Sequence, residues 1–257
     1  MSMSEPDKLY HKMAHPAGVA FSVTNPLIDH WLNCWNNTNP LLDIGCGNCH
    51  NSLKALDFGA QVYATELNEN SLHLLQQEHK DKADRLSFHL AQLPDSMPLP
   101  DNYFSGILCS EVFHFLKHEE ILASIQQLHR LLIPGGKAVL TCACEDIQIF
   151  QAVNLRQTKE TQRQKYPDRM DPVDHYIDYF EQAIREFEPD HEAWQLRTLL
   201  DSILPRDMFN YFNPDQLAKA FADAGFHIDL ITTGPALHYP AWEHGEHDHV
   251  RLVAAKQ

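Results

Sequence analysis

Apolar positions in this chain come in short runs that alternate with amphipathic segments. A run that is apolar throughout suits a strand buried on both faces of a parallel sheet. The pattern predicts strands over residues 41–45, 60–67, 85–91, 105–110, 137–143, 227–233 and 250–256.

Amphipathic segments lie between these runs, and the spacing of their apolar residues predicts helices over 51–59, 69–80, 119–132 and 213–226. Gly59 and Gly225 are typical of helix ends, and Asn213 before Pro214 is typical of a helix start. The segment IPGG at 133–136 predicts a turn. Regular alternation of strand and helix predicts a parallel sheet covered by helices on both faces.

Two stretches break this alternation. Residues 145–211 are polar, helix-prone and rich in aromatic side chains, which is typical of an insertion rather than of the sheet. Residues 234–249, GPALHYPAWEHGEHDH, form a long loop between the last two predicted strands and carry four histidines. We therefore expect one α/β unit with a sizeable insertion, as the length of 257 residues allows.

Charge narrows the range of partners. The chain has 35 acidic against 20 basic residues, a net charge of −15, and no cluster of lysine and arginine that could neutralise phosphates. This disfavours nucleic-acid substrates and favours a small molecule. No apolar stretch is long enough to span a membrane, and residues 1–15 lack the features of a secretory signal, so we expect a cytoplasmic protein whose six cysteines are thiols.

The sequence LLDIGCGNCH at 41–50 places a glycine-rich turn directly after the first predicted strand. Ligands of open α/β sheets bind beyond the carboxyl ends of the strands. Gly45 and Gly47 allow the backbone to turn sharply and to approach a ligand closely, and Asp43 can accept hydrogen bonds there. Glu66, at the predicted end of the second strand, can grip both hydroxyls of a ribose. Together these residues indicate a nucleoside.

The turn does not match the best-known nucleotide motifs. A dinucleotide fingerprint requires glycine at the sixth position of G-x-G-x-x-G, where this chain has His50. A phosphate-binding loop for nucleoside triphosphates requires a lysine that is absent here. A nicotinamide-dependent oxidoreductase stays open as an alternative, as does a noncatalytic protein that retains the nucleoside pocket.

Several segments in order resemble the class I S-adenosylmethionine-dependent methyltransferases. LLDIGCGNC is similar to the cofactor loop of that family, with Cys49 where a third glycine is usual, and YATEL at 63–67 resembles its ribose-binding segment. Residues 90–116 resemble the adenine-contact stretch and fourth strand, with Leu90 in place of the usual acidic residue. LHRLLIPGGKAVL at 128–140 resembles the passage into the fifth strand.

The resemblance implies a doubly wound, Rossmann-like α/β sheet of seven strands whose last strand is antiparallel. It divides the chain into a core at 41–144 and 212–257, a helical insertion at 145–211 between strands five and six as a substrate cover, and a helical lid segment at 1–40. It implies S-adenosyl-L-methionine as the cofactor. The expected cofactor-binding residues are Asp43, Gly45, Cys46, Gly47, Glu66, Leu67, Ala91, Gln92, Leu93, Cys109 and Ser110.

The expected reaction is transfer of the sulfonium methyl group to a small-molecule acceptor, because the chain lacks the Asn-Pro-Pro-Tyr type segment of relatives that methylate amide or ring nitrogens. His114 follows the fourth strand at the rim where the family meets its substrates, so it is the candidate catalytic base. Gln92 or Asp95 is expected to hold the adenine amine, and Leu67 to pack on the adenine. The acceptor and the oligomeric state stay open.

The segments outside the core suggest a cover for the site. Residues 11–26 can close over the cofactor as a lid. In the insertion, five aromatic and aliphatic residues recur at helical spacing, which favours a core-facing stripe over a substrate wall. They are Tyr176, Tyr179, Phe180, Ile184 and Phe187.

Two groups of residues offer metal ligands. The first comprises His238, His244, His247 and His249 with Glu243, Glu246 and Asp248, but its spacing matches no zinc pattern, so a solvated polar loop is favoured. The second comprises five cysteines near the strand ends, for which packing is the ordinary interpretation and a soft-metal acceptor the alternative: Cys46, Cys49, Cys109, Cys142 and Cys144. We therefore assign no metal ligand, and whether the histidine loop or the cysteines bind a metal stays open.

Overall fold

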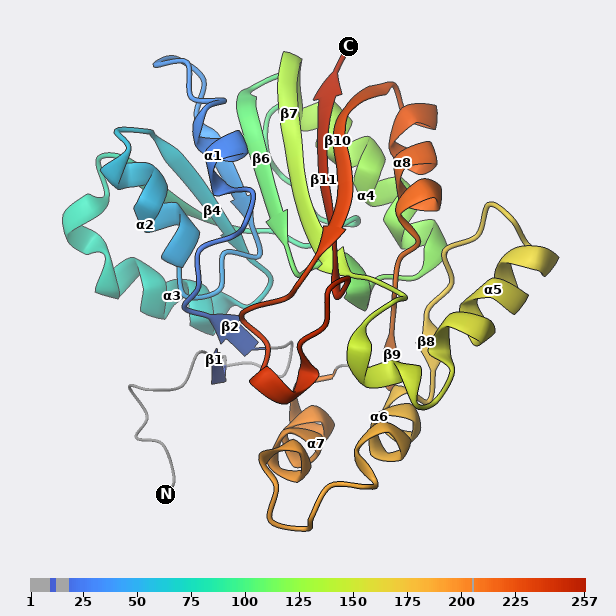
Figure 1. Ribbon diagram of the computed structural model, residues 1–257. Coiled ribbons are helices and arrows are strands. Elements are labelled where there is room, and N and C mark those ends of the chain that lie inside the picture. The colour runs from blue at the N-terminus through green and yellow to red at the C-terminus, as the bar shows by residue number, and fades with distance from the viewer. Residues whose placement is uncertain (1–9, 13–18, 205) are drawn as a thin grey trace.

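A seven-stranded sheet forms the centre of the computed structural model, which describes residues 10–12, 19–204 and 206–257 (Figure 1). The order of the strands across the sheet is β10-β11-β7-β6-β3-β4-β5. β11 pairs antiparallel with both of its neighbours, while β3, β4, β5, β6 and β7 are mutually parallel. The predicted doubly wound α/β fold with an antiparallel last strand is confirmed. The strands are β3 Leu41–Ile44, β4 Val62–Glu66, β5 Leu86–Leu90, β6 Phe104–Ser110, β7 Leu132–Ala143, β10 Phe226–Gly234 and β11 His249–Lys256.

The apolar runs become strands because both faces of the sheet are covered. One face packs against α1 (Ile28–Leu32), α2 (His50–Asp57) and α3 (Glu69–Glu78), and the other against α4 (His118–Leu131) and α8 (Pro214–Asp223). All four residues of β3 are buried. The expected helix ends are confirmed. The Asn213 side chain accepts hydrogen bonds from the amides of residues 215 and 216, and Gly59 and Gly225 adopt φ angles of +98° and +92°.

The segment IPGG differs from the prediction. Instead of a turn before the strand, it lies inside β7, which begins at Leu132. Leu132 already pairs with Phe104 of β6, and the register shifts before the pairing resumes between Lys137 and Gly106. Backbone pairing on both sides of the glycines thus turns the predicted connection into an irregular part of the strand, with Gly135 at φ +78°.

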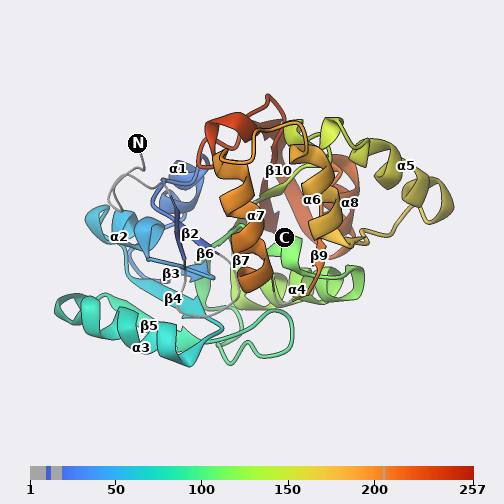
Figure 2. The same cartoon turned by 90° about the horizontal axis from the view of Figure 1, so that it is seen from below.

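The residues between β7 and α8 lie beyond the carboxyl ends of the parallel strands (Figures 1 and 2). They pack around their own apolar cluster, which includes Phe150, Phe180 and Tyr211. Seen from below the sheet, α6 and α7 lie across its end (Figure 2). The elements are η4 Gln148–Gln151, α5 Leu155–Lys165, β8 Val173–Asp174, α6 Tyr176–Ile184, α7 Glu192–Ile203 and β9 Met208–Phe209.

Within 1–40, the described residues form a small antiparallel hairpin and one short helix. β1 (Tyr10–Lys12) pairs with β2 (Val19–Phe21), and α1 follows. Part of the expected lid, residues 13–18, lies outside the described residues. Among the helices that the structure does describe, none combines the length and apolarity needed to cross a bilayer.

Candidate active site

A cavity of about 430 Å³ lies at the carboxyl ends of β3, β4 and β6, between the sheet and the insertion. Eleven of the twelve residues predicted to bind cofactor or to catalyse line this cavity: Asp43, Gly45, Cys46, Gly47, Glu66, Leu67, Ala91, Gln92, Leu93, Ser110 and His114. Cys109 is not among the lining residues. Its side chain is buried in the apolar core, because neighbouring residues of a strand face opposite sides and Ser110 takes the cavity side. The roles of the lining residues stay predictions.

The glycine-rich turn has the backbone that its sequence requires. Gly45 has φ +66°, and a Cβ atom there would lie 2.8 Å from Cγ2 of Val112. Gly47 has φ +56°, and Cys49 has φ +63° although it carries a side chain. Cys49 therefore holds the left-handed conformation for which glycine is preferred, at a cost of about 1 kcal/mol. Its Sγ lies 3.7 Å from Sγ of Cys46, and all six cysteines are free thiols, as predicted.

Two carboxyl groups flank the turn. Oε1 of Glu66 accepts a hydrogen bond from the Gly47 amide at 2.8 Å, and Oε2 accepts one from the Leu67 amide at 3.2 Å. Glu66 is 5% exposed and faces the cavity rather than bulk solvent. Asp43 accepts a hydrogen bond from the Ser52 hydroxyl at 2.7 Å, and burial raises the pKa of Asp43 to about 7. The turn and Glu66 form one concave surface.

The segment after β5 forms the neighbouring wall. Gln92 and Ser96 exchange two backbone hydrogen bonds, so the chain doubles back beside the cavity. Gln92, Asp95 and Leu67 all line the cavity, and Leu67 is 48% exposed. The three residues expected near an adenine thus all line this cavity.

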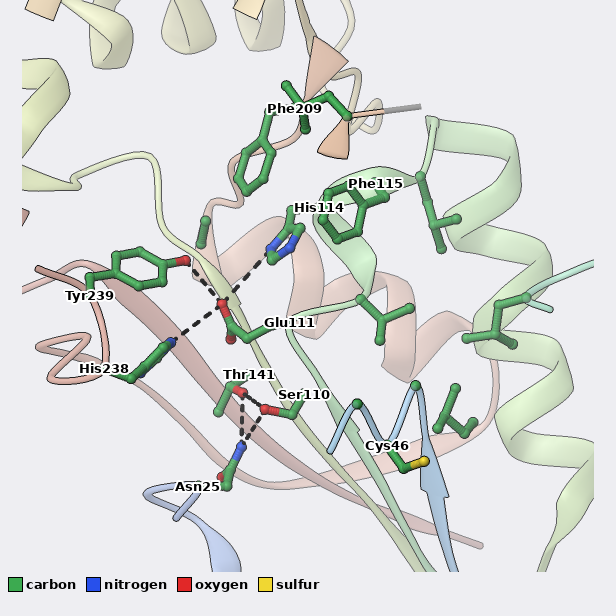
Figure 3. Close-up of a pocket in the computed structure, with 18 of the residues that line it drawn as sticks. Asn25, Cys46, Ser110, Glu111, His114, Phe115, Thr141, Phe209, His238 and Tyr239 are labelled. Atoms are coloured by element: carbon green, nitrogen blue, oxygen red, sulfur yellow. Dashed lines mark hydrogen bonds and ion pairs between the residues drawn. The ribbon is translucent and has the colours of Figure 1, made fainter. Parts of the chain in front are cut away.

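Asn25 connects the N-terminal segment to the strand ends, a contact that the sequence analysis missed. Its side-chain amide donates hydrogen bonds to Ser110 Oγ at 2.9 Å and to Thr141 Oγ1 at 3.0 Å (Figure 3). Residues 23–26 line the cavity, so this bond places a described part of the expected lid against the site. Only the polar sequence SVTNP hinted at it, because the partners lie 85 and 116 residues away.

Glu111, directly after β6, is the centre of a second group that the sequence analysis missed (Figure 3). Its Oε2 lies 3.0 Å from His249 Nε2, 3.0 Å from the Tyr239 hydroxyl, 3.7 Å from His238 Nε2 and 4.0 Å from His114 Nδ1. Burial acts to raise the pKa of Glu111, but His249 and His238 outweigh it and hold that pKa well below its ordinary value. The available signal was an acidic residue at the end of a predicted strand.

His114 lies on the cavity wall in a short 3₁₀ turn, Phe113–Phe115, after β6. Its ring stacks on Phe209 with centroids 4.3 Å apart, and the residue is 4% exposed. Burial lowers the pKa of His114 to about 4, so the imidazole is neutral near pH 7. A neutral imidazole at a cavity wall has the protonation state of a base.

The interpretation of residues 238–249 as a solvated loop is wrong for four of them. His238, Glu243, Asp248 and His249 are all buried. Oxygen atoms of Asp248 accept hydrogen bonds from the backbone amides of residues 148, 236 and 245, which folds the loop inward. His247 remains exposed and contacts Thr233 Oγ1. Sequence spacing could not separate the two sets, because this loop has no regular period.

Aromatic side chains line another part of the cavity, away from Cys46 of the glycine-rich turn (Figure 3). Tyr176 and Phe180 come from α6, and their stripe packs into the core of the insertion, as predicted. The same two residues also face the cavity, so packing and wall are not exclusive. The aromatic lining comprises Phe115, Phe150, Tyr176, Phe180, Phe209, Tyr211 and Tyr239.

Comparisons with known proteins agree with this fold. Residues 42–140 match the family described as "Methyltransferase domain". A SAM-dependent methyltransferase from Methanosarcina mazei is 14% identical, with a TM-score of 0.60 over 90% of this chain and 97% of that one. Geranyl diphosphate C-methyltransferase from Streptomyces coelicolor A3(2), solved with Mg²⁺, geranyl diphosphate and S-adenosyl-L-homocysteine, is 13% identical, with a TM-score of 0.56 over 90% and 78%.

A SAM-dependent methyltransferase from Mesorhizobium loti is 16% identical, with a TM-score of 0.55 over 85% of this chain and 91% of that one. No curated protein matches the sequence significantly. The resemblance seen in the sequence is confirmed to this extent: residues 42–140 match the methyltransferase-domain family, and the chain has the fold of class I methyltransferases.

Proposed function

We propose that this protein is an S-adenosyl-L-methionine-dependent methyltransferase that methylates a small molecule with a largely apolar body. The family match and the fold support S-adenosyl-L-methionine as the cofactor. One observation carries the finer proposal. A single cavity runs from the glycine-rich turn and Glu66 to the aromatic side chains of the insertion, so donor and acceptor would share one enclosure.

The cofactor end suits an adenosine linked to methionine. Gly45 and Gly47 line the cavity without side chains, and Glu66 offers carboxylate oxygens to ribose hydroxyls. Leu67 and Gln92 would flank the adenine. Asp43, with a pKa raised to about 7, would meet the amino group of the methionine part, whose positive charge favours the ionised carboxylate.

The reaction is a displacement at carbon. The methyl–sulfur bond breaks, a bond from the methyl carbon to the acceptor forms, and S-adenosyl-L-homocysteine leaves. Because the sulfonium already activates the methyl group, the protein contributes mainly by alignment and exclusion of water. For a hydroxyl or protonated amine acceptor, His114 on the cavity wall takes up the departing proton.

The segments outside the core complete the enclosure. Residues 23–26, held by the Asn25 hydrogen bonds, cover one side, and the insertion covers the other. We assign to both the role of excluding water during transfer. The aromatic lining favours terpenoid-like or quinone-like acceptors over small charged metabolites, because apolar surface binds apolar ligands. Geranyl diphosphate, the ligand of the Streptomyces structure, combines such an apolar prenyl chain with a charged diphosphate.

The test begins with the cofactor. Calorimetric titration of the purified protein with S-adenosyl-L-homocysteine should show one site per chain, and Glu66→Gln should weaken it by about tenfold or more, because a carboxylate binds hydroxyls more strongly than an amide does. Glu69→Gln, an exposed change three residues away, is the matched control. No heat with wild type, or binding of NADH instead, would contradict the proposal.

The acceptor is then sought by turnover. The protein is incubated with S-adenosyl-L-methionine and a panel of apolar alcohols, prenyl compounds and quinols, beside a panel of polar amines and acids, and release of S-adenosyl-L-homocysteine is measured. We expect turnover in the apolar panel only, and its loss in His114→Ala for hydroxyl acceptors. Turnover confined to the polar panel would overturn the acceptor class.

A further inference from the structure

Three side chains from separate segments converge beside the cavity in an arrangement suited to a metal ion. Glu111 follows β6, His238 lies in the β10–β11 loop, and His249 begins β11. One ligand atom of each lies within 4.8 Å of the others. Two ligands on one zinc ion at about 2.0–2.1 Å each stand about 3.3 Å apart in a tetrahedral site. The observed separations from Glu111 Oε2 are 3.0 Å to His249 Nε2 and 3.7 Å to His238 Nε2, on either side of that value.

The surroundings of Glu111 leave room for a positive charge. Among the described residues, every ion-pair partner of this carboxylate is an imidazole, and neither lysine nor arginine is one of them. Its Oε1 is buried without a hydrogen bond. His114, 4% exposed, directs an Nδ1 atom toward the same carboxylate from 4.0 Å, too far for a hydrogen bond, and the described residues offer that atom no other partner (Figure 3).

We propose that Glu111, His238 and His249 bind one divalent transition-metal ion of the zinc type. Two imidazoles and one carboxylate are a ligand set found in catalytic zinc sites, which keep one position open. Magnesium and calcium are disfavoured because they prefer oxygen ligands. The site lies outside the glycine-rich turn and Glu66, so the ion would not compete with the cofactor for the same groups.

The position of the site assigns the ion to the acceptor. Glu111 and His238 line the cavity and His249 is not among its lining residues, so an ion held by all three would stand at the cavity wall with its open position toward the interior. There the ion would bind an oxygen or nitrogen atom of the acceptor and fix it beside His114. This role rests on the proposed function, whereas binding of the ion itself does not.

Metal binding is tested on the full chain without cofactor. Protein stripped with a chelator is titrated with Zn²⁺, and metal content is measured by mass spectrometry; a second sample receives Co²⁺, whose visible absorption reports its coordination. We expect one ion per chain and a cobalt spectrum of a low-coordinate site. Wild type that takes up no ion, or a cobalt spectrum equal to that of hydrated Co²⁺, would overturn the proposal. Neither measurement depends on the folding of a variant.

Two matched changes locate the ion. His249→Gln and Glu111→Gln should each weaken Zn²⁺ binding by at least about 100-fold, more than is typical for loss of a supporting contact. His247→Gln, two residues away in the same loop but exposed, should leave the affinity within about twofold of wild type. Equal losses in His247→Gln and His249→Gln would overturn the assignment, and thermal melting followed by circular dichroism shows whether each variant is folded.

The same samples separate this inference from the proposed function. S-Adenosyl-L-homocysteine is titrated into stripped and Zn²⁺-loaded protein. Binding of the nucleoside with no uptake of Zn²⁺ overturns the metal site and leaves the methyltransferase intact. Uptake of Zn²⁺ with no nucleoside binding supports the site and contradicts the proposed function.

Discussion

The two ends of the cavity are built in different ways. At the cofactor end, the turn between β3 and α2 is the central element, joined by Glu66 of β4, and backbone conformation at Gly45 and Gly47 shapes the surface. At the acceptor end, side chains from β6, the insertion and the β10–β11 loop converge from distant parts of the sequence. The cofactor end therefore depends on glycine positions that accept no side chain, whereas the acceptor end depends on which side chains come together.

The largest effect is expected at the cofactor end. Gly45→Ala would place a Cβ atom 2.8 Å from Val112 in a backbone with φ +66°, so the turn must move. We expect S-adenosyl-L-homocysteine binding to weaken by at least about 100-fold, or about 2.7 kcal/mol, by calorimetry.

Gly59→Ala is the control for that change. Gly59 also has a positive φ angle, +98°, but a Cβ atom there meets no neighbouring atom within 4 Å. It should cost about 1 kcal/mol of folding free energy and leave nucleoside affinity unchanged. Similar loss of affinity in both variants would show that strain, rather than the shape of the turn, explains the first result.

The next effect concerns the acceptor end, where one buried carboxyl group should make the free energy of unfolding depend on pH. Burial raises the pKa of Glu243 to about 8, from 4.5 in the unfolded chain. The folded protein therefore keeps a proton that the unfolded chain has released, and Glu243 makes the protein progressively less stable as pH rises from about 4.5 to about 8. Glu243→Gln removes this loss. Relative to wild type, it should gain about 3–4 kcal/mol between pH 5 and pH 8.5, measured by urea unfolding.

If the free energy of unfolding differed between wild type and Glu243→Gln by the same amount at both pH values, Glu243 would not be protonated in the folded protein. Glu246→Gln, an exposed change in the same loop, is the control and should produce no such difference.

A smaller effect separates the two ends by function. Phe209 stacks on His114 and lines the cavity, so Phe209→Ala should raise the KM for an apolar acceptor by about tenfold, about 1.4 kcal/mol of lost apolar contact. Nucleoside affinity should stay within about twofold. Steady-state kinetics measures the KM for the acceptor, and calorimetry measures the nucleoside affinity. Equal changes in both would contradict the separation of the two ends.

The smallest effect is expected at Leu67. Leu67 is 48% exposed, so Leu67→Ala removes only part of the wall near the adenine. Nucleoside affinity should therefore fall by about threefold without a change in the KM for the acceptor. The same titration and kinetics decide it. A large loss would mean that the adenine covers this side chain more fully than the free protein suggests.

The same contrast explains how much could be predicted from sequence. The strands, the helix ends and the residues of the cofactor end follow local rules, namely apolar runs, capping residues and glycines at a strand exit. Both Cys109 and Ser110 were predicted at the site, but only Ser110 lines the cavity, because neighbouring strand residues face opposite sides. Glu111 and His249 are 138 residues apart and meet only because β11 inserts between β7 and β10. No local pattern carries that information.

The β10–β11 loop also contains Trp242, whose ring meets Phe187 with centroids 5.6 Å apart and Phe180 with centroids 6.4 Å apart. Its indole therefore joins the loop that holds His238 to the helix that forms the aromatic wall. Any occupant that shifts one against the other changes the environment of a natural fluorophore. Its fluorescence can therefore follow the binding of such a ligand in the cavity in real time, without an added label.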